Sequence, residues 1–145
     1  MIPRQHPDMK TVKHGFMTYR NGIVADALRK SGQPYSIIFG LQLPQLSQIA
    51  RELEPSVDLG RALWSDRNVR ESRLLAAWLF PVEALSEDEA LAMARDVRTR
   101  EEADILAFRL LRRHPAADII ASTLLSESEP LPHYSGEALQ RNINA

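Results

Sequence analysis

The stretch VRTREEADILAFRLL, residues 97–111, carries the strongest fold signal in the chain. Thr99 followed by Glu102 is a capping box, in which the two side chains bond to backbone N–H groups that the first helical turn leaves unpaired. Apolar residues then recur at helical spacing, at positions Ala103, Leu106, Ala107, Leu110 and Leu111. The stretch therefore predicts an amphipathic helix that carries Asp104 close to its start.

The same signals recur on both sides of this helix. Ser86 and Glu89 form a second capping box, Pro55-Ser56 starts a short helix, and His114-Pro115 starts another. Helix starts near residues 57, 87 and 115 are thus about thirty residues apart, and each short helix is followed by a longer one. Repetition of helix pairs is typical of α-solenoids, although HEAT units usually span roughly 40 residues. A plain helical bundle would give the same periodicity, so both architectures stay open on spacing alone.

The two ends of the chain have weaker patterns. Helical spacing runs from Asp8 to Ser31-Gly32, interrupted by two glycines, and QPYSIIFGLQL (33–43) is interpreted as an extended or buried connector before a helix at Pro44. From residue 127 onward, turn-forming residues predict a loose tail with a turn of helix near 137–141. We expect an all-α protein of about seven helices, with one helical-repeat domain over 1–126 and a loosely ordered C-terminal tail over 127–145.

Composition excludes several classes of function. The chain has 145 residues, a net charge of −1 and no cysteine, which excludes disulfide scaffolds, thiol catalysis and zinc sites with cysteine ligands. The four histidines lack metal-binding spacing, and there is no glycine-rich phosphate loop and no G-x-S-x-G motif, so we expect no metal and no cofactor. The polar N-terminus and the short longest apolar run, residues 74–80, predict a cytoplasmic protein without a membrane span.

Arginine dominates the cations, with fifteen Arg against three Lys. A planar guanidinium suits phosphate, but a GC-rich genome would give the same bias. Rows of arginines occur at 67–73, 95–100 and 109–113. If stacking brings them onto one surface they form a DNA-binding strip, for which the candidates are Arg70, Arg73, Arg98 and Arg100; otherwise they are the solvated faces of amphipathic helices.

Two segments resemble a known family. LGRALWSDRNVRESRLLAAWLF resembles the "L-W-x-S... E-x-R-x-x-A" signature of the DNA alkylation repair family, the AlkD-like helical-repeat DNA glycosylases. FGLQLPQLSQIARELE is similar to the segment that precedes it in that family. The resemblance covers roughly residues 35–125 and implies a HEAT-like superhelix of stacked helix pairs, duplex DNA as the partner, and structural pairing by Glu71 and Arg73.

The resemblance also implies a catalytic residue. The family places an aspartate after a tryptophan in a "W-D-x-x-D" stretch, and the matching position here is Asp104, with Arg100 in the place of the tryptophan. A carboxylate there would stabilise the oxocarbenium character that develops on deoxyribose as an alkylated purine leaves. The family's later arginine and tryptophan are expected to have no counterpart, which predicts weak or degenerate alkylpurine glycosylase activity.

Each of these interpretations has a structural alternative. Asp104 can form an ordinary exposed i, i+4 ion pair with Arg100, and Trp64 and Trp78 fit core packing. The alternative function is a catalytically inert repeat scaffold that binds a protein partner or forms a homodimer through an exposed apolar end.

Overall fold

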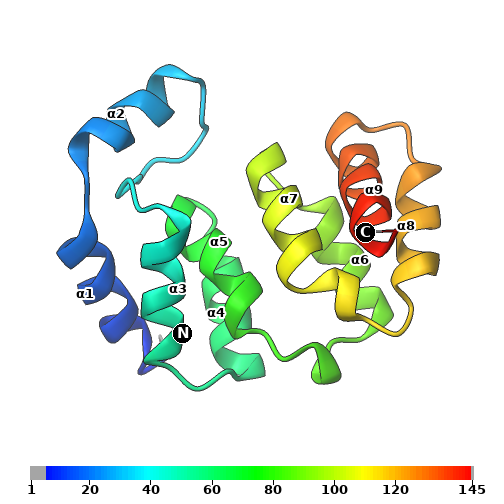
Figure 1. The fold of residues 1–145 in the computed structure, drawn as a ribbon, viewed down its shortest axis with the longest axis horizontal. Coiled ribbons are helices and arrows are strands. Elements are labelled where there is room, and N and C mark those ends of the chain that lie inside the picture. Colours follow the sequence, from blue (N-terminus) through cyan, green and yellow to red (C-terminus); the bar gives the residue numbers. More distant parts are fainter. Residues whose placement is uncertain (1–5, 145) are drawn as a thin grey trace, which may run out of the picture. The chain divides into compact units, whose positions relative to one another are not determined.

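The computed structural model describes residues 6–144 and is all-helical, which confirms the predicted fold class (Figure 1). Within these residues the chain forms no strand, and the connector pairs with the rest of the chain only through an isolated parallel bridge between Ile37 and Val69. The α-helices are α1 (Met9–Tyr19), α2 (Gly22–Lys30), α3 (Leu43–Arg51), α4 (Val57–Ser65), α5 (Arg70–Leu79), α6 (Glu87–Arg95), α7 (Arg100–Arg109), α8 (Ala117–Leu125) and α9 (Pro130–Ile143), with short 3-10 turns η1 (Val82–Ala84) and η2 (Leu111–Arg113).

The chain divides into two compact units, Met1–Phe80 and Pro81–Ala145. The single domain expected over 1–126, followed by a tail over 127–145, stays a prediction. The division falls at Pro81, directly after the end of α5, where proline ends the helix because it lacks a backbone N–H and restricts the preceding residue. In the part of the chain that the structure describes, no helix is long and apolar enough to span a bilayer.

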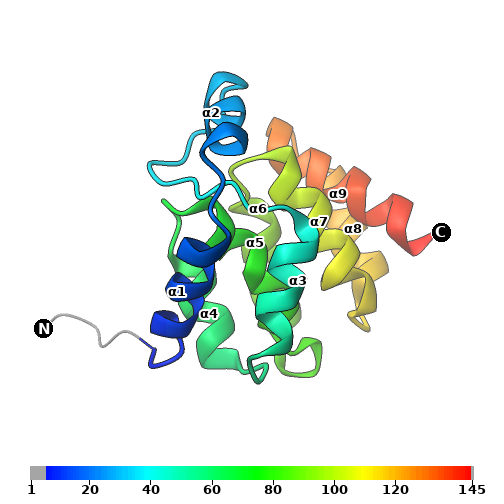
Figure 2. The ribbon, with the colours of Figure 1, turned by 60° about the vertical axis from the view of Figure 1, so that its left-hand side comes forward.

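Four helices, α1, α3, α4 and α5, form the main core of the first unit. Helix α1 packs against α3 and α4, and α5 packs against α3 and α4, so that the four helices enclose one core (Figure 2). Phe16, Leu46, Leu59 and Leu74 are fully buried there. Burial of such side chains is the main favourable contribution to folding of the unit.

Helix α2 belongs to a separate small core of the first unit. The predicted helical segment 8–31 breaks because Asn21 caps α2, its side chain accepting from the N–H groups of Ile23 and Val24. The apolar side of α2 then packs with the connector through Ala25, Tyr35 and Ile38. The connector itself, residues 33–42, forms no helix and buries Tyr35, Ile38 and Leu41, which agrees with the expectation of a buried connector.

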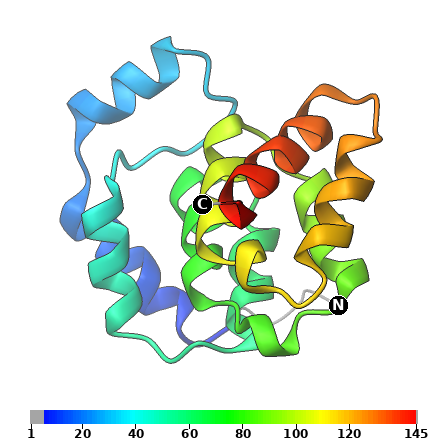
Figure 3. The same cartoon turned by 45° about the vertical axis from the view of Figure 1, so that its right-hand side comes forward.

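The second unit consists of α6 to α9. Ser86 accepts a hydrogen bond from the Glu89 N–H at the start of α6, and Thr99 accepts one from Glu102 at the start of α7, which confirms both predicted helix starts. Helix α9 contacts α6, α7 and α8, and Figure 3 shows it in red beside α8 and α7.

The segment expected to be a loose tail is therefore mostly helix α9. Its buried residues, Ser135, Gly136, Ala138 and Leu139, form a narrow stripe of small side chains around one leucine. The Ser135 hydroxyl donates to the Ala94 carbonyl of α6, which anchors the helix in the unit. Serine and glycine favour turns in an isolated chain. In α9, Ser135 and Gly136 are instead buried small residues that allow neighbouring helices to approach closely.

Candidate nucleic-acid interface

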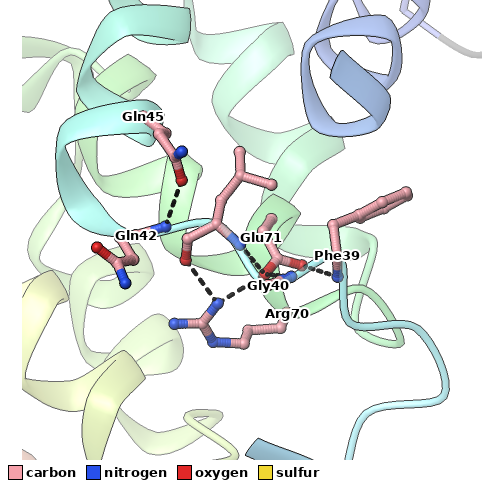
Figure 4. Close-up of polar contacts among 7 residues, drawn as sticks. Phe39, Gly40, Gln42, Gln45, Arg70 and Glu71 are labelled. Atoms are coloured by element: carbon pink, nitrogen blue, oxygen red, sulfur yellow. Dashed lines mark hydrogen bonds and ion pairs between the residues drawn. The ribbon is translucent and has the colours of Figure 1, made fainter. Parts of the chain in front are cut away.

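Two of the four candidate DNA-binding arginines, Arg70 and Arg73, are buried. Arg70 forms an ion pair of 2.6 Å with Glu71, and the same nitrogen donates to the Leu41 carbonyl at 3.0 Å. Glu71 is fully buried and accepts from the backbone N–H groups of Phe39, Gly40 and Leu41 (Figure 4). The pair therefore fastens the connector to the start of α5.

Arg73 holds a different part of the same unit. Its guanidinium carbon lies 3.5 Å from the centroid of the Trp64 ring, and it donates to the Trp64 carbonyl at 2.8 Å. The carbonyl terminates α4, where cations interact favourably with the helix dipole. Only 1% of the Arg73 surface and 4% of the Arg70 surface are exposed, so the contacts of both arginines lie inside the protein.

Asp104 lies on the exposed side of α7 and makes its contacts with α9. The Tyr134 hydroxyl donates to Asp104 Oδ1 at 2.8 Å, and Arg141 Nη2 lies 3.6 Å from the same oxygen. About half of the Asp104 side chain stays exposed. The carboxylate is thus oriented from the neighbouring helix and remains accessible to solvent.

Arg100 also turns toward α9 rather than pairing with Asp104. Its guanidinium carbon lies 4.7 Å from the centroid of the Tyr134 ring, and that of Arg141 lies 5.6 Å from it. Arg98, the remaining candidate, is half-buried beside the start of α7, where its backbone N–H donates to Glu102. Arg100 and Asp104 are therefore brought together through Tyr134, and Arg70 and Arg73 belong to the other unit.

One turn further along α7, a second aromatic ring is paired with arginine. Phe108 is 48% exposed, so part of its ring is open to solvent. The guanidinium carbon of Arg112 lies 4.4 Å from its ring centroid, and that of Arg109 lies 5.9 Å from it. We define the α7–α9 face as the residues Arg100, Asp104, Phe108, Arg109, Arg112, Tyr134 and Arg141.

The charge of this face differs from that of its surroundings. Residues 81–145 hold seven of the eighteen Lys and Arg residues and twelve of the nineteen Asp and Glu residues, so the second unit is acidic as a whole. The α7–α9 face holds four arginines and one carboxylate. Any anion that binds to this unit must therefore be attracted locally, over a distance comparable to the Debye length of about 8 Å at physiological salt.

The surroundings of Tyr134 affect its ionisation. Partial burial raises the pKa of the Tyr134 phenol above its ordinary value, and the hydrogen bond to Asp104 raises it further, because both disfavour the phenolate. Arg141 acts in the opposite direction. The hydrogen bond from Tyr134 to Asp104 consequently persists at neutral pH.

A spectroscopic titration tests this arrangement. We expect the Tyr134 phenol, identified as the signal that is lost in Tyr134→Phe, to titrate above a pH of about 10. In Asp104→Asn its pKa is expected to fall toward the ordinary value. Since the pKa is raised in the folded protein, its contribution to stability is present below the unfolded pKa and is lost as the pH rises through the folded one. Ultraviolet difference spectra of the three-tyrosine protein and both variants measure this; a Tyr134 pKa unchanged in Asp104→Asn would contradict the assigned contact.

No cluster of metal-ligating side chains occurs among residues 6–144. The chemistry of the α7–α9 face is instead that of guanidinium groups, aromatic rings and one carboxylate. Guanidinium groups bind phosphate through paired hydrogen bonds, and exposed rings stack on bases.

The sequence did not point to three residues of this face. Tyr134 and Arg141 lie in the segment interpreted as a tail, and they are seven positions apart, so a helical interpretation would have placed them on one side of α9. Phe108 offers a clearer signal, because it falls outside the apolar stripe of α7 and is followed by Arg109 and Arg112.

The fold and this face define a helical-repeat protein with an arginine- and aromatic-rich surface. A solved structure described as "a new family of proteins related to the HEAT-like repeat DNA glycosylases with affinity for branched DNA structures" is similar to this chain, with a TM-score of 0.78 and 16% identity. The match covers 90% of this chain and 55% of that one, so the chain spans about half the length of the matched structure. No family model and no curated protein matches the sequence. The similarity shows a HEAT-like repeat fold.

Proposed function

We propose that this protein binds DNA through the α7–α9 face and prefers branched DNA. The observation that carries the proposal is the pairing of guanidinium groups with two rings, Arg100 with the partly buried ring of Tyr134 and Arg112 with the half-exposed ring of Phe108. Arginine supplies phosphate contacts, and the rings supply surfaces on which bases stack. This combination suits a nucleic acid with distorted or unpaired segments better than a uniform duplex.

The fold comparison supports the same partner. The similar structure belongs to proteins with affinity for branched DNA, and its fold is the one adopted here. Fold alone does not define function, so the proposal depends on the α7–α9 face. Because the rest of the second unit is acidic, binding relies on few arginines, and each of them contributes strongly.

Asp104 is the residue that we propose for glycosidic bond cleavage on such DNA. An alkylated purine is a cationic leaving group, and positive charge develops on the deoxyribose as it departs. A fixed carboxylate stabilises that charge electrostatically. Tyr134 and Arg141 contact the carboxylate from α9, through a hydrogen bond of 2.8 Å and an ion pair of 3.6 Å.

Fluorescence anisotropy with labelled three-way junctions and linear duplexes, over a range of salt concentrations, tests DNA binding. We expect Arg100→Gln and Arg141→Gln to weaken binding and each to reduce the salt slope by about one. Arg95→Gln is the matched control, because Arg95 is a half-exposed arginine of the same unit that is paired with Glu127. Its substitution changes the net charge equally, so an equal loss of affinity would show that overall charge, and not the α7–α9 face, determines binding.

The same proteins test Asp104. We expect the wild type to release an alkylated base from duplex or branched DNA and Asp104→Asn to bind DNA without releasing it. Binding without base release in the wild type would overturn the enzymatic part of the proposal and leave a DNA-binding repeat protein. A wild type that binds no DNA at low salt would overturn the whole proposal in favour of the alternative, a scaffold that binds a protein or a second copy of itself.

A further inference from the structure

The second unit contains an open cleft next to the α7–α9 face. It has a volume of about 430 Å³ and lies where η2, the start of α8 and the end of α9 meet. Arg112, Arg113, His114, Asp118 and Asn142 contribute to its walls. Cleft and face share one residue, Arg112, whose guanidinium lies over the Phe108 ring.

The two arginines of the cleft retain donors for a ligand. Arg112 is exposed and has no hydrogen-bond acceptor among the described residues; its contact is with the Phe108 ring. Arg113 donates through Nε and Nη2 to the Arg109 carbonyl, which fixes the direction of its guanidinium and leaves Nη1 for another acceptor. A preorganised guanidinium loses little conformational entropy when it binds an oxyanion.

The other walls of the cleft are fixed or oppose an anion. His114 is held by both ring nitrogens: Nε2 donates to the Leu85 carbonyl, and Nδ1 accepts from the Ala116 N–H. Asn142 donates to the Ala138 carbonyl. Asp118 is an exposed carboxylate with no ion pair among the described residues, and it reduces the positive charge contributed by the two arginines. The net positive charge of the lining is therefore small, and it suits one phosphate group better than several consecutive phosphates.

Phe108 indicates which kind of molecule carries that group. Its half-exposed ring is adjacent to the cleft through Arg112, so a ligand held by the arginines can place a flat group on the ring. A nucleotide has both parts: a phosphate for the guanidinium groups and a base that stacks on an aromatic face. In a paired duplex the bases are stacked on each other, so only an unpaired nucleotide offers its base in this way.

We propose that the cleft formed by Arg112 and Arg113 binds the phosphate of an unpaired nucleotide whose base stacks on Phe108. The proposal rests on the proposed DNA-binding function and names the part of a branched DNA that this surface recognises. The ligand class is a single-stranded segment at or near a branch point, held by one phosphate and one base.

Anisotropy with a labelled single-stranded oligonucleotide of about eight nucleotides and the full chain tests the phosphate contact. We expect Arg112→Gln and Arg113→Gln each to weaken binding several-fold and Arg95→Gln to leave it nearly unchanged. Asp118→Asn removes the opposing carboxylate and is expected to tighten binding. Affinities of the Arg112 and Asp118 variants equal to that of the Arg95 variant would overturn the cleft as the phosphate site.

Phe108→Leu tests the stacking contact, since leucine keeps an apolar side chain but removes the ring. Loss of one base–aromatic stack is expected to weaken single-strand binding by about fivefold or more, with little change in binding to a linear duplex. Equal weakening on both DNA forms would contradict base stacking. Circular dichroism of each variant verifies that the fold is retained.

Competition experiments distinguish a nucleotide from free phosphate. A nucleoside monophosphate is expected to displace the oligonucleotide at lower concentration than inorganic phosphate, and this advantage should disappear in Phe108→Leu. Equal competition by the two ligands would overturn the nucleotide assignment. Two outcomes separate this inference from the proposed function. If the wild type binds branched DNA through Arg100 and Arg141, but the Arg112 and Phe108 variants bind single strands as well as the wild type does, this inference fails and the proposed function stands. If the wild type binds no form of DNA, both fail.

Discussion

Replacing Glu71 with alanine is expected to lower the free energy of unfolding of the first unit by about 3–5 kcal/mol. Glu71 is fully buried, and its two carboxylate oxygens accept from three consecutive backbone N–H groups of the connector and from Arg70. Alanine would leave the Arg70 guanidinium buried without its carboxylate partner, although Arg70 still donates to the Leu41 carbonyl. An uncompensated buried charge destabilises far more than the intact pair stabilises.

Chemical denaturation of the full chain, with hydrogen exchange at the connector amides, measures this loss. Glu54→Ala, at an exposed carboxylate of the same unit, is the matched control and is expected to change stability by no more than about 0.5 kcal/mol. In Glu71→Ala/Arg70→Met the buried charge is removed with its partner, so the double variant should be more stable than Glu71→Ala alone. A Glu71→Ala protein as stable as the control would show that the connector is held mainly by the apolar packing of Tyr35 and Ile38.

The buried carboxylate also explains why the burial of two arginines could not be predicted from the sequence pattern alone. In LGRALWSDRNVRESRLLAAWLF, Arg70 and Arg73 follow one another at helical spacing, and such residues usually lie on a solvated face. Their partners, the connector backbone and the Trp64 ring, come from other segments, so their burial depends on tertiary contacts that local periodicity does not contain. The family resemblance anticipated structural roles for Glu71 and Arg73, but the ion pair is between Glu71 and Arg70.

Helix starts were predictable because their chemistry is local. Ser86 and Thr99 satisfy N–H groups three residues along the chain, so the sequence alone defines them. Helix α9 was not predictable in this way, since its prolines lie in the first turn and its buried stripe is made of small residues. The prediction of the candidate site was incomplete for the same reason. The sequence pointed to Asp104 on α7, but the residues that contact it, Tyr134 and Arg141, lie on α9, which was not predicted as a full helix.

Gly40→Ala is expected to be the second strongly destabilising substitution, and its effect should be concentrated around α2. Gly40 has φ +87°, a left-handed conformation that costs an alanine about 1–2 kcal/mol. An added Cβ would also collide with the backbone carbonyl of Asn21 and lie 2.9 Å from the Ala25 nitrogen. Neither atom can move freely, because the Asn21 carbonyl accepts from Ala25 N–H and the Asn21 N–H donates to Phe39. Overpacking of this kind adds about 1–3 kcal/mol.

Gly32→Ala separates the two contributions to the Gly40 effect. Gly32 has a similar φ of +96°, but no neighbouring atom of residues 6–144 lies within 4 Å of the position of an added Cβ, so its substitution should show the conformational cost alone. Denaturation of both variants is expected to show a clearly larger loss for Gly40→Ala, with faster hydrogen exchange in α2 than in α4 and α5. Helix α2 is affected first because it packs in its own small core with Tyr35 and Ile38 rather than in the main core of the unit. Equal losses for the two glycines would mean that α2 moves away from the connector without resistance, and that the Asn21–Phe39 hydrogen bond contributes little to holding it there.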